Sequence, residues 1–272
     1  MTPQRWLVTG CSTGLGRALA QDLAQSGEKV IATARRPETL ADLSGPNLVT
    51  AALDVRDPAQ SQAAVDLAVQ RFGGIDVLVN NAGYGQFGSV EEVSDDELRA
   101  QFETNVFGAW RLTRQVLPLW RAQGSGRAIF VSSLSGSMPF PGLAAYTASK
   151  FALEGLAESL AQDAGMFGVK VTILQLGGFA TAYGKSLRLP AQRIGEYSPV
   201  EDEMLAMTRG LADSGTATPP ELFALLVRHV VALEQPPLRL PFGEGAFEYL
   251  GVAMAARQKD FEDAAATNTL NA

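Results

Sequence analysis

The sequence predicts a single α/β domain in which a predominantly parallel sheet of seven strands is doubly wound, with helices on both faces. Short β-branched runs alternate with longer helical patterns, which is typical of βαβ units. The runs are almost continuously apolar, as expected for a parallel sheet that is covered on both sides. The predicted strands span residues 6–9, 30–34, 48–55, 77–80, 128–132, 169–174 and 238–242.

The length of the chain bounds its organisation. With 272 residues, of which 46% are hydrophobic and 19% charged, it can bury a sizeable core as one large domain or two small ones. No repeat or low-complexity tract interrupts the alternation. We therefore expect one domain over residues 1–272.

The first predicted strand leads into a glycine-rich turn. Thr9-Gly10-Cys11-Ser12-Thr13-Gly14-Leu15-Gly16 precedes a helical pattern over residues 17–25. Glycines at such a turn let a pyrophosphate approach backbone N–H groups at the helix N-terminus, where the helix dipole favours an anion. The spacing differs from the G-x-G-x-x-G fingerprint, and a helix entry without a ligand is the alternative. Cys11 is interpreted as a small filler rather than a reactive thiol.

The second predicted strand ends in Ala34-Arg35-Arg36. An NAD site usually places an acidic residue here, on the adenosine ribose. A guanidinium pairs bidentately with a 2′-phosphate, whereas a carboxylate would repel it. The sequence therefore predicts NADP(H) over NAD(H), with two solvated arginines ahead of Pro37 as the alternative.

The next three predicted strands end in polar residues. These ends are Asp54-Val55, Asn80-Asn81-Ala82-Gly83 and Ser132-Ser133, and taken singly they could be a cap, a turn and a polar strand terminus. Ser94-x-x-Glu97 predicts a capping box at a helix start. Negative charge is favourable near a helix start, so the neighbouring acidic residues are interpreted as a solvated face. They are Glu91, Glu92, Asp95 and Asp96.

Ser133, Tyr146 and Lys150 stand at a spacing that can move a proton without histidine or metal. Tyr146 and Lys150 are four residues apart, so on a helix they share one face and the ammonium can approach the phenol. A free phenol has a pKa of roughly 10, and a fixed cation can bring it toward about 7. The tyrosine then becomes a usable general acid or base. An amphipathic helix with a surface lysine and a half-buried tyrosine is the alternative.

The segment after the sixth predicted strand breaks the alternation. Residues 179–217 contain glycines, prolines and scattered apolar residues, and a long excursion here is a candidate lid. Thr218-x-x-Glu221 predicts a second capping box. His229 stands at helical spacing and is interpreted as structural, so a Ser-His hydrolase is poorly supported.

Composition limits the partners of the chain. A formal charge of -7 without a Lys/Arg run argues against nucleic acid or an anionic membrane, so a small molecule is expected. A single cysteine excludes an internal disulfide and a thiolate metal cluster, and no metal site is predicted. Strand-like sequence begins by about Arg5, and no apolar stretch approaches the ~20 residues of a membrane span. The chain is predicted to be cytoplasmic.

In their order along the chain, these motifs resemble those of the classical short-chain dehydrogenase/reductase family. Thr9-Gly10-x-x-x-Gly14-x-Gly16 resembles its cofactor turn, Asn105 matches its helix asparagine, and Ser133 precedes Tyr146 by thirteen residues as in the family. The resemblance covers nearly the whole chain and implies a Rossmann-type fold. It also implies cofactor contacts, which together with the two arginines are Gly10, Ser12, Thr13, Gly14, Leu15, Gly16, Arg35, Arg36, Asp54, Val55, Asn81, Ala82, Gly83, Tyr146, Lys150, Gly178, Phe179 and Thr181.

The resemblance further implies that the chain interconverts a carbonyl and an alcohol by hydride transfer. Tyr146 would protonate the carbonyl oxygen, and Ser133 would hydrogen-bond it. Lys150 would lower the tyrosine pKa and hold the nicotinamide ribose, while Asn105 would anchor a water that connects Lys150 to solvent. Charge develops on the carbonyl oxygen in the transition state, and donors fixed around that oxygen stabilise it.

One departure from the family lies after the sixth predicted strand. Leu176 replaces the usual proline, so the loop loses a fixed φ and the contacts of Gly178, Phe179 and Thr181 are left open. Thr181 is still placed to meet the carboxamide.

Several apolar residues follow the carboxyl ends of predicted strands, where open α/β sheets bind ligands. They are Phe87, Met138, Phe140, Phe179, Tyr183 and Leu187. They suggest a pocket for a lipophilic alcohol or ketone, steroid-like or retinoid-like, with core packing as the alternative.

The resemblance also implies a homodimer or homotetramer, formed through helices near residues 94–117 and 146–167. Two other functions are alternatives to the NADP(H)-dependent enzyme. One is a redox-sensing regulatory protein that binds NADP(H) without chemistry, and the other is an NAD-dependent alcohol dehydrogenase.

Overall fold

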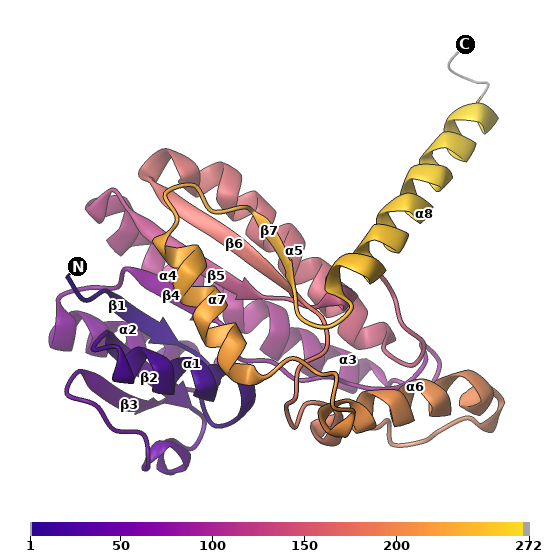
Figure 1. Ribbon diagram of the computed structural model, residues 1–272, viewed down its shortest axis with the longest axis horizontal. Helices are drawn as coiled ribbons and strands as arrows, with labels where there is room; N and C mark the ends of the chain where they lie inside the picture. Colours follow the sequence, from indigo (N-terminus) through magenta and orange to yellow (C-terminus); the bar gives the residue numbers. More distant parts are fainter. Residues whose placement is uncertain (1, 269–272) are drawn as a thin grey trace.

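The computed structural model describes residues 2–268 and contains one parallel sheet of seven strands in the order β3-β2-β1-β4-β5-β6-β7 (Figure 1). The doubly wound fold predicted from the sequence is confirmed. The strands are β1 (Arg5–Val8), β2 (Lys29–Ala34), β3 (Leu48–Ala52), β4 (Val77–Asn80), β5 (Gly126–Val131), β6 (Val169–Leu176) and β7 (Arg239–Phe242).

Helices cover both faces of this sheet. α1 (Gly14–Gln25) and α7 (Pro220–Ala232) pack together on one face, where Leu19, Leu23 and Phe223 are fully buried. α2 (Pro58–Phe72), α4 (Gly108–Gln123) and α5 (Ala144–Ala164) bury Leu112 and Trp120 on the other face. Each layer removes an apolar helix stripe and one side of the sheet from water, which is the main stabilising term of such a fold.

The remaining helices lie around the carboxyl ends of the strands. They are α3 (Asp95–Phe102), α6 (Ser198–Gly210) and α8 (Ala246–Thr267), and α8 projects away from the body of the molecule (Figure 1). One π-helical turn, η2 (Glu103–Phe107), separates α3 from α4. The short 3-10 turns are η1 (Pro37–Leu40), η3 (Leu134–Gly136), η4 (Gly165–Phe167), η5 (Gly184–Ser186), η6 (Gly195–Tyr197) and η7 (Leu211–Asp213).

The two predicted capping boxes have different outcomes. At α3, the Ser94 side chain accepts from Glu97 N–H and the Glu97 side chain accepts from Ser94 N–H, so this box is confirmed. The box predicted at Thr218 is wrong, because α7 starts at Pro220 and the Thr218 hydroxyl accepts the N–H of Glu244 at 2.9 Å instead.

The segment 179–217 leaves the βα alternation, as expected. It carries η5, η6, α6 and η7 beside the carboxyl ends of the strands. No helix among residues 2–268 combines the length and the apolarity that crossing a membrane requires.

Candidate active site

The strand order reverses between β1 and β4, and the site residues gather at this switch point, where open α/β sheets bind ligands. Gly10 and Gly14 have φ of +71° and +58°, a region that side chains rarely adopt. A Cβ on Gly10 would lie 2.9 Å from Cα of Ala82, and one on Gly16 would overlap the Asn81 amide. Glycine is therefore required for the close approach of this turn to the end of β4.

The N-terminus of α1 fits a phosphate group. Thr13 is its N-cap but makes no side-chain cap hydrogen bond, so the first N–H groups are available to a ligand. A Cβ on Gly14 would lie 3.7 Å from the Thr181 side chain, which faces the turn from the other side. Cys11 is fully buried and its pKa is raised by burial to about 12, as expected of a filler.

Asn81 holds the turn rather than presenting a free amide. Its Nδ2 donates to the carbonyls of Thr9 at 2.8 Å and Gly10 at 3.2 Å. The N–H groups of Asn81 and Ala82 both donate to Thr9 Oγ1 at 2.9 Å. Contacts from this loop to a cofactor would therefore use the backbone of Ala82 and Gly83.

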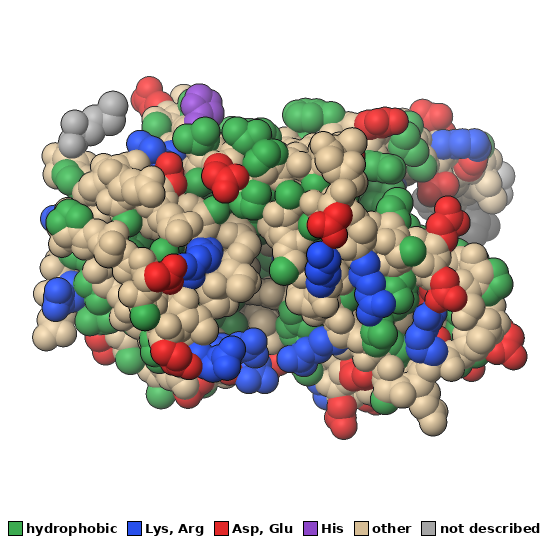
Figure 2. Space-filling model, turned by 60° about the horizontal axis from the view of Figure 1, so that its bottom comes forward, with side chains coloured by type: hydrophobic (Ala, Val, Ile, Leu, Met, Phe, Trp, Pro, Cys, Tyr) green, Lys and Arg blue, Asp and Glu red, His purple; other side chains and the backbone are tan. Residues whose placement is uncertain are grey.

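Arg35 and Arg36 follow β2 directly and are both exposed. Within residues 2–268, neither guanidinium forms an ion pair. Asp54 lies close by, and its carboxylate accepts from Arg56 Nη2 at 2.6 Å, which lowers the pKa of Asp54. Figure 2 shows a hollow near the middle of one face with Lys and Arg side chains beside it.

Tyr146 and Lys150 share the buried face of α5, as predicted, and Ser133 lies two residues beyond the end of β5, directly before η3. The Lys150 Nζ lies 5.6 Å from the centre of the Tyr146 ring and donates to the Val131 carbonyl at 2.7 Å. Ser133 Oγ accepts the N–H of Ser135 at 3.2 Å, which leaves its own proton free to be donated.

The prediction that Lys150 acidifies Tyr146 is not met in this arrangement. Burial raises the pKa of Tyr146, and the nearby hydroxyls of Ser133 and Tyr183 offset this only in part. Burial also lowers the pKa of Lys150 to about 8, opposed by the charge of Glu154. The physical reason is that the ammonium faces the ring of the tyrosine and is held by a backbone carbonyl.

Asn105 is buried in the π-helical turn, a geometry that is frequent at functional sites. Its Nδ2 donates to the carbonyl of Tyr84 at 3.0 Å and to Ser149 Oγ at 3.1 Å, and its Oδ1 accepts the Tyr84 N–H. This amide therefore fixes the loop after β4 against α5. Its water-anchoring role stays a prediction.

Sequence reasoning missed Glu154, which is buried one turn beyond Lys150. Its carboxylate accepts from Ser132 Oγ at 2.7 Å, Gln175 Nε2 at 3.0 Å and Arg239 Nε at 3.2 Å. These partners lie at or next to β5, β6 and β7, so Glu154 connects three strands beneath the site. In the sequence, an acidic residue four positions after a lysine indicates only an ordinary side-chain pair on a helix, so nothing marked Glu154 as part of the site.

The loop after β6 absorbs the departure at Leu176. Leu176 is buried and pairs with Phe242 at the end of the sheet. Gly178 N–H donates to the carbonyl of Glu244 at 3.0 Å, and the carbonyl of Gly178 accepts the Thr218 N–H at 3.0 Å. Backbone hydrogen bonds on both sides thus hold the loop without the proline.

The residues of the predicted apolar pocket fall into more than one cluster in the structure. Phe87, Leu187, Phe140 and Tyr183 form one cluster with Tyr146. Two expectations are corrected. The Phe179 ring packs into the main core, 6.3 Å from the ring centre of Phe223, and Met138 packs against the base of α8.

The acidic segment around the start of α3 is only partly a solvated face. Glu91, Asp95 and Asp96 are exposed, but Glu92 is buried, which corrects the prediction. Glu92 Oε1 accepts the Ile194 N–H at 2.6 Å, so the carboxylate attaches the segment 179–217 to the body.

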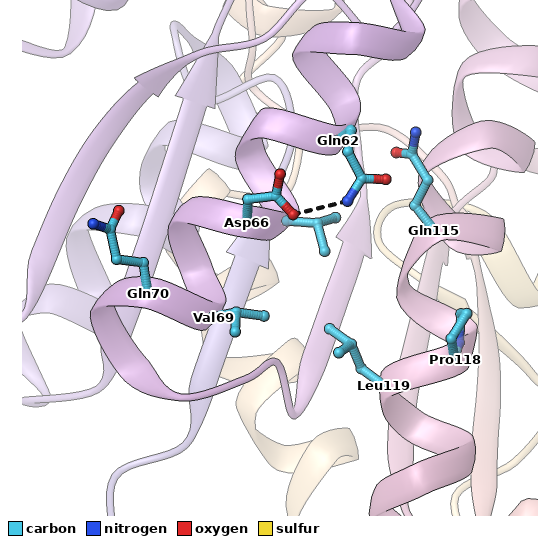
Figure 3. A pocket seen from close by; sticks show the side chains of 8 residues that line it. Gln62, Asp66, Val69, Gln70, Gln115, Pro118 and Leu119 are labelled. Atoms are coloured by element: carbon cyan, nitrogen blue, oxygen red, sulfur yellow. Dashed lines mark hydrogen bonds between the residues drawn. The ribbon is translucent and has the colours of Figure 1, made fainter.

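A surface groove and the single histidine both lie away from the predicted site residues. A groove of about 580 Å³ runs between α2 and α4, where Gln62 donates to Asp66 at 2.8 Å (Figure 3). None of the predicted site residues lines it. His229 is exposed on α7, in agreement with a structural role.

Comparisons with known proteins agree with the fold of this chain. The family model described as short chain dehydrogenase matches residues 4–192. An oxidoreductase of Botryotinia fuckeliana is 39% identical over 255 residues, covering 91% of this chain and 92% of its own. A 3-ketodihydrosphingosine reductase of Bacteroides thetaiotaomicron is 32% identical, covering 89% of each chain.

Two solved structures are similar to this chain over nearly its whole length. A short-chain dehydrogenase from Streptomyces avermitilis is 36% identical with a TM-score of 0.91 and covers 100% of both chains. A short-chain dehydrogenase/reductase from Burkholderia phymatum in complex with NAD is 25% identical with a TM-score of 0.83, covering 96% of this chain and 94% of its own. The family model, the relatives and the solved structures each match most of the chain, so this chain belongs to the short-chain dehydrogenase family of oxidoreductases, which act on CH–OH and C=O groups.

Proposed function

We propose that this protein interconverts a lipophilic ketone and its alcohol with NADP(H), with Tyr146 as the general acid or base. The observation that carries the proposal is the convergence of Tyr146, Lys150 and Ser133 beside a glycine turn whose helix N-terminus lacks a side-chain cap. A carbonyl substrate bound between these side chains and the glycine turn would contact a proton donor on one side. On the other side it would contact a cofactor anchored through its phosphates.

Each side chain has a separate role in the proposed reaction. A bound nicotinamide would supply the hydride to the carbonyl carbon. Tyr146, kept protonated by burial, gives its proton to the carbonyl oxygen, and the free Ser133 proton donates a hydrogen bond to that oxygen. Lys150, whose Nζ lies 5.6 Å from the centre of the Tyr146 ring and donates to the Val131 carbonyl, would hold the nicotinamide ribose.

The test is NADPH oxidation against a panel of carbonyl compounds, with wild type and Tyr146→Phe side by side. We expect Tyr146→Phe to lose nearly all turnover and to keep the wild-type dissociation constant for NADPH. Unimpaired turnover by this variant would remove Tyr146 from the acid role. Absence of turnover by the wild type across the panel, despite tight NADPH binding, would favour a non-catalytic sensor.

The preference for NADP(H) rests on Arg35 and Arg36, because both are exposed and without an ion pair among residues 2–268. Two charge-assisted hydrogen bonds to a 2′-phosphate are worth about 3 kcal/mol together, or roughly 100-fold in affinity. Exchanging both for alanine should weaken NADPH binding by that factor and leave NADH unchanged. The control is Arg71→Ala at the far end of α2. Equal or tighter NADH binding by the wild type would refute the preference.

The lipophilic substrate is supported by the cluster of Phe87, Leu187, Phe140 and Tyr183 around Tyr146. One relative is named for reduction of 3-ketodihydrosphingosine, which is a long-chain ketone. We further propose that the segment 179–217, attached through Glu92, acts as a lid over this cluster. A panel that showed preference for small polar ketones would overturn the substrate class.

An oligomer is proposed through α4 and α5. Phe107, Trp110 and Phe151 lie on or beside these helices and are 47%, 53% and 38% exposed, which is high for large apolar side chains. Trp110→Glu should reduce the mass measured by light scattering. An unchanged mass would contradict this interface.

A further inference from the structure

Tyr183 brings a second phenol next to Tyr146. It lies in the proposed lid directly before η5, and the two ring centres are 5.6 Å apart. The Tyr183 hydroxyl is buried and makes no hydrogen bond of good geometry within residues 2–268, although the Tyr146 hydroxyl lies near enough to raise its pKa. A buried hydroxyl without a partner costs free energy, so a functional partner is the natural explanation.

The backbone around Tyr183 is held firmly. Its N–H donates to Thr181 Oγ1 at 3.3 Å, and its carbonyl accepts the Ser186 N–H at 3.0 Å. Gly184 packs so closely on α6 that a Cβ there would overlap the carbonyl oxygen of Thr208. This packing limits where the phenol can point.

The Tyr183 side chain lies between Tyr146 and the loop that follows β4. A Cβ on Gly85 would be 2.5 Å from its oxygen, which brings the hydroxyl against the loop that follows β4. Burial and the neighbouring Tyr146 raise the pKa of Tyr183 well above its usual value. The phenol therefore stays protonated and can donate a hydrogen bond. Its other neighbours include the apolar Phe87 and Leu187, which offer no side-chain acceptor.

We propose that the Tyr183 hydroxyl recognises a second oxygen of the substrate, on the carbon next to the reacting carbonyl. This inference rests on the proposed function and assigns the substrate class of the same site. Tyr146 takes the reacting oxygen and Tyr183 the adjacent one. The substrates are then lipophilic α-hydroxy, α-alkoxy or α-dicarbonyl compounds. A plain ketone leaves the buried phenol unpaired, and sites of this kind discriminate against analogues that lack the partner.

The experiment measures kcat/KM for decan-2-one, 1-hydroxydecan-2-one and 1-methoxydecan-2-one with NADPH. Wild type is compared with Tyr183→Phe and with Tyr197→Phe. Tyr197 is a matched control, because it belongs to the same lid and its hydroxyl donates to Glu91 at 2.8 Å, outside the cluster around Tyr146. The ether oxygen of the methoxy ketone can only accept, so this compound isolates donation by Tyr183.

We expect Tyr183→Phe to lower kcat/KM for both oxygenated ketones by about tenfold relative to decan-2-one, the size of one hydrogen bond. Tyr197→Phe should leave this ratio at the wild-type value. Because Tyr183→Phe removes an unpaired hydroxyl, its Tm should equal or exceed that of the wild type.

Two results would overturn the inference alone. One is an unchanged ratio in Tyr183→Phe while the wild type turns over decan-2-one. The other is a lowered Tm with equal losses on all three ketones, which would show a packing role. If the wild type reduces none of the ketones and no other member of the carbonyl panel, the proposed function fails as well.

Discussion

Glu154→Gln tests most directly how the site is held together. The substitution keeps the shape of the side chain and removes the charge that accepts from Ser132, Gln175 and Arg239. An amide has one acceptor oxygen and two donor protons, so the amide nitrogen must face at least one of the present donors. The side chain is only 4% exposed, and water cannot replace what is lost.

The magnitude follows from these contacts. A hydrogen bond to a charged group is worth about 1.5–3 kcal/mol, and one such bond is lost outright. The share of Arg239 is small, because it is 39% exposed and keeps its second partner Glu158. We expect the free energy of unfolding to fall by about 2–3 kcal/mol. For a domain of this size that lowers Tm by roughly 4–12 °C.

The assay is thermal unfolding followed by circular dichroism, with Glu158→Gln as the control. Glu158 pairs with the same arginine but is 45% exposed, so its variant should change Tm little. The charge of Glu154 raises the pKa of Lys150, so Glu154→Gln should also move the alkaline loss of NADPH affinity to lower pH. A Tm within about 2 °C of the wild type would refute the reasoning.

Three further outcomes are expected. Glu92→Gln weakens the acceptor of the Ile194 N–H, so hydrogen exchange and proteolysis of the lid should become faster; an unchanged lid would contradict this attachment. Gly16→Ala should lower both Tm and NADPH affinity, because its Cβ overlaps the Asn81 amide. Gly155→Ala, with nothing within 4 Å, should raise helix stability by about 0.5–1 kcal/mol, and equal effects of the two would be inconsistent with this packing. The lowered pKa of Lys150 means that the folded state holds this proton less tightly than the unfolded state. Stability relative to Lys150→Met should therefore fall as pH falls from 10.5 to about 8, and a flat difference in denaturant titrations would argue against a buried ammonium.

Much of the fold and of the site could be predicted because both depend on local patterns. Continuous apolar runs separated by helical periods require a covered parallel sheet, and short right-handed connections leave few orders for its strands. Gly10 and Gly14 predicted a tight turn ahead of a helix, and Tyr146 and Lys150 share a helix face at any α-helical geometry. These features need no knowledge of distant parts of the chain.

The rest depends on side chains that are far apart in the sequence. Glu154 looks like an ordinary helix acid until the sheet order brings Gln175 and Arg239 against it. From the sequence alone, Glu92 is predicted to be solvated. In the structure the segment 179–217 packs against it, and Glu92 is buried.

The sequence by itself determined the layers, the glycine-rich turn and the candidates for proton transfer, since each follows from residue type and short-range spacing. Only the tertiary structure decided that the Phe179 ring turns into the core while the buried Tyr183 side chain lies beside Tyr146. The reason is that hydrophobic periodicity sets which elements form, whereas the direction and protonation of a loop side chain depend on long-range packing and burial.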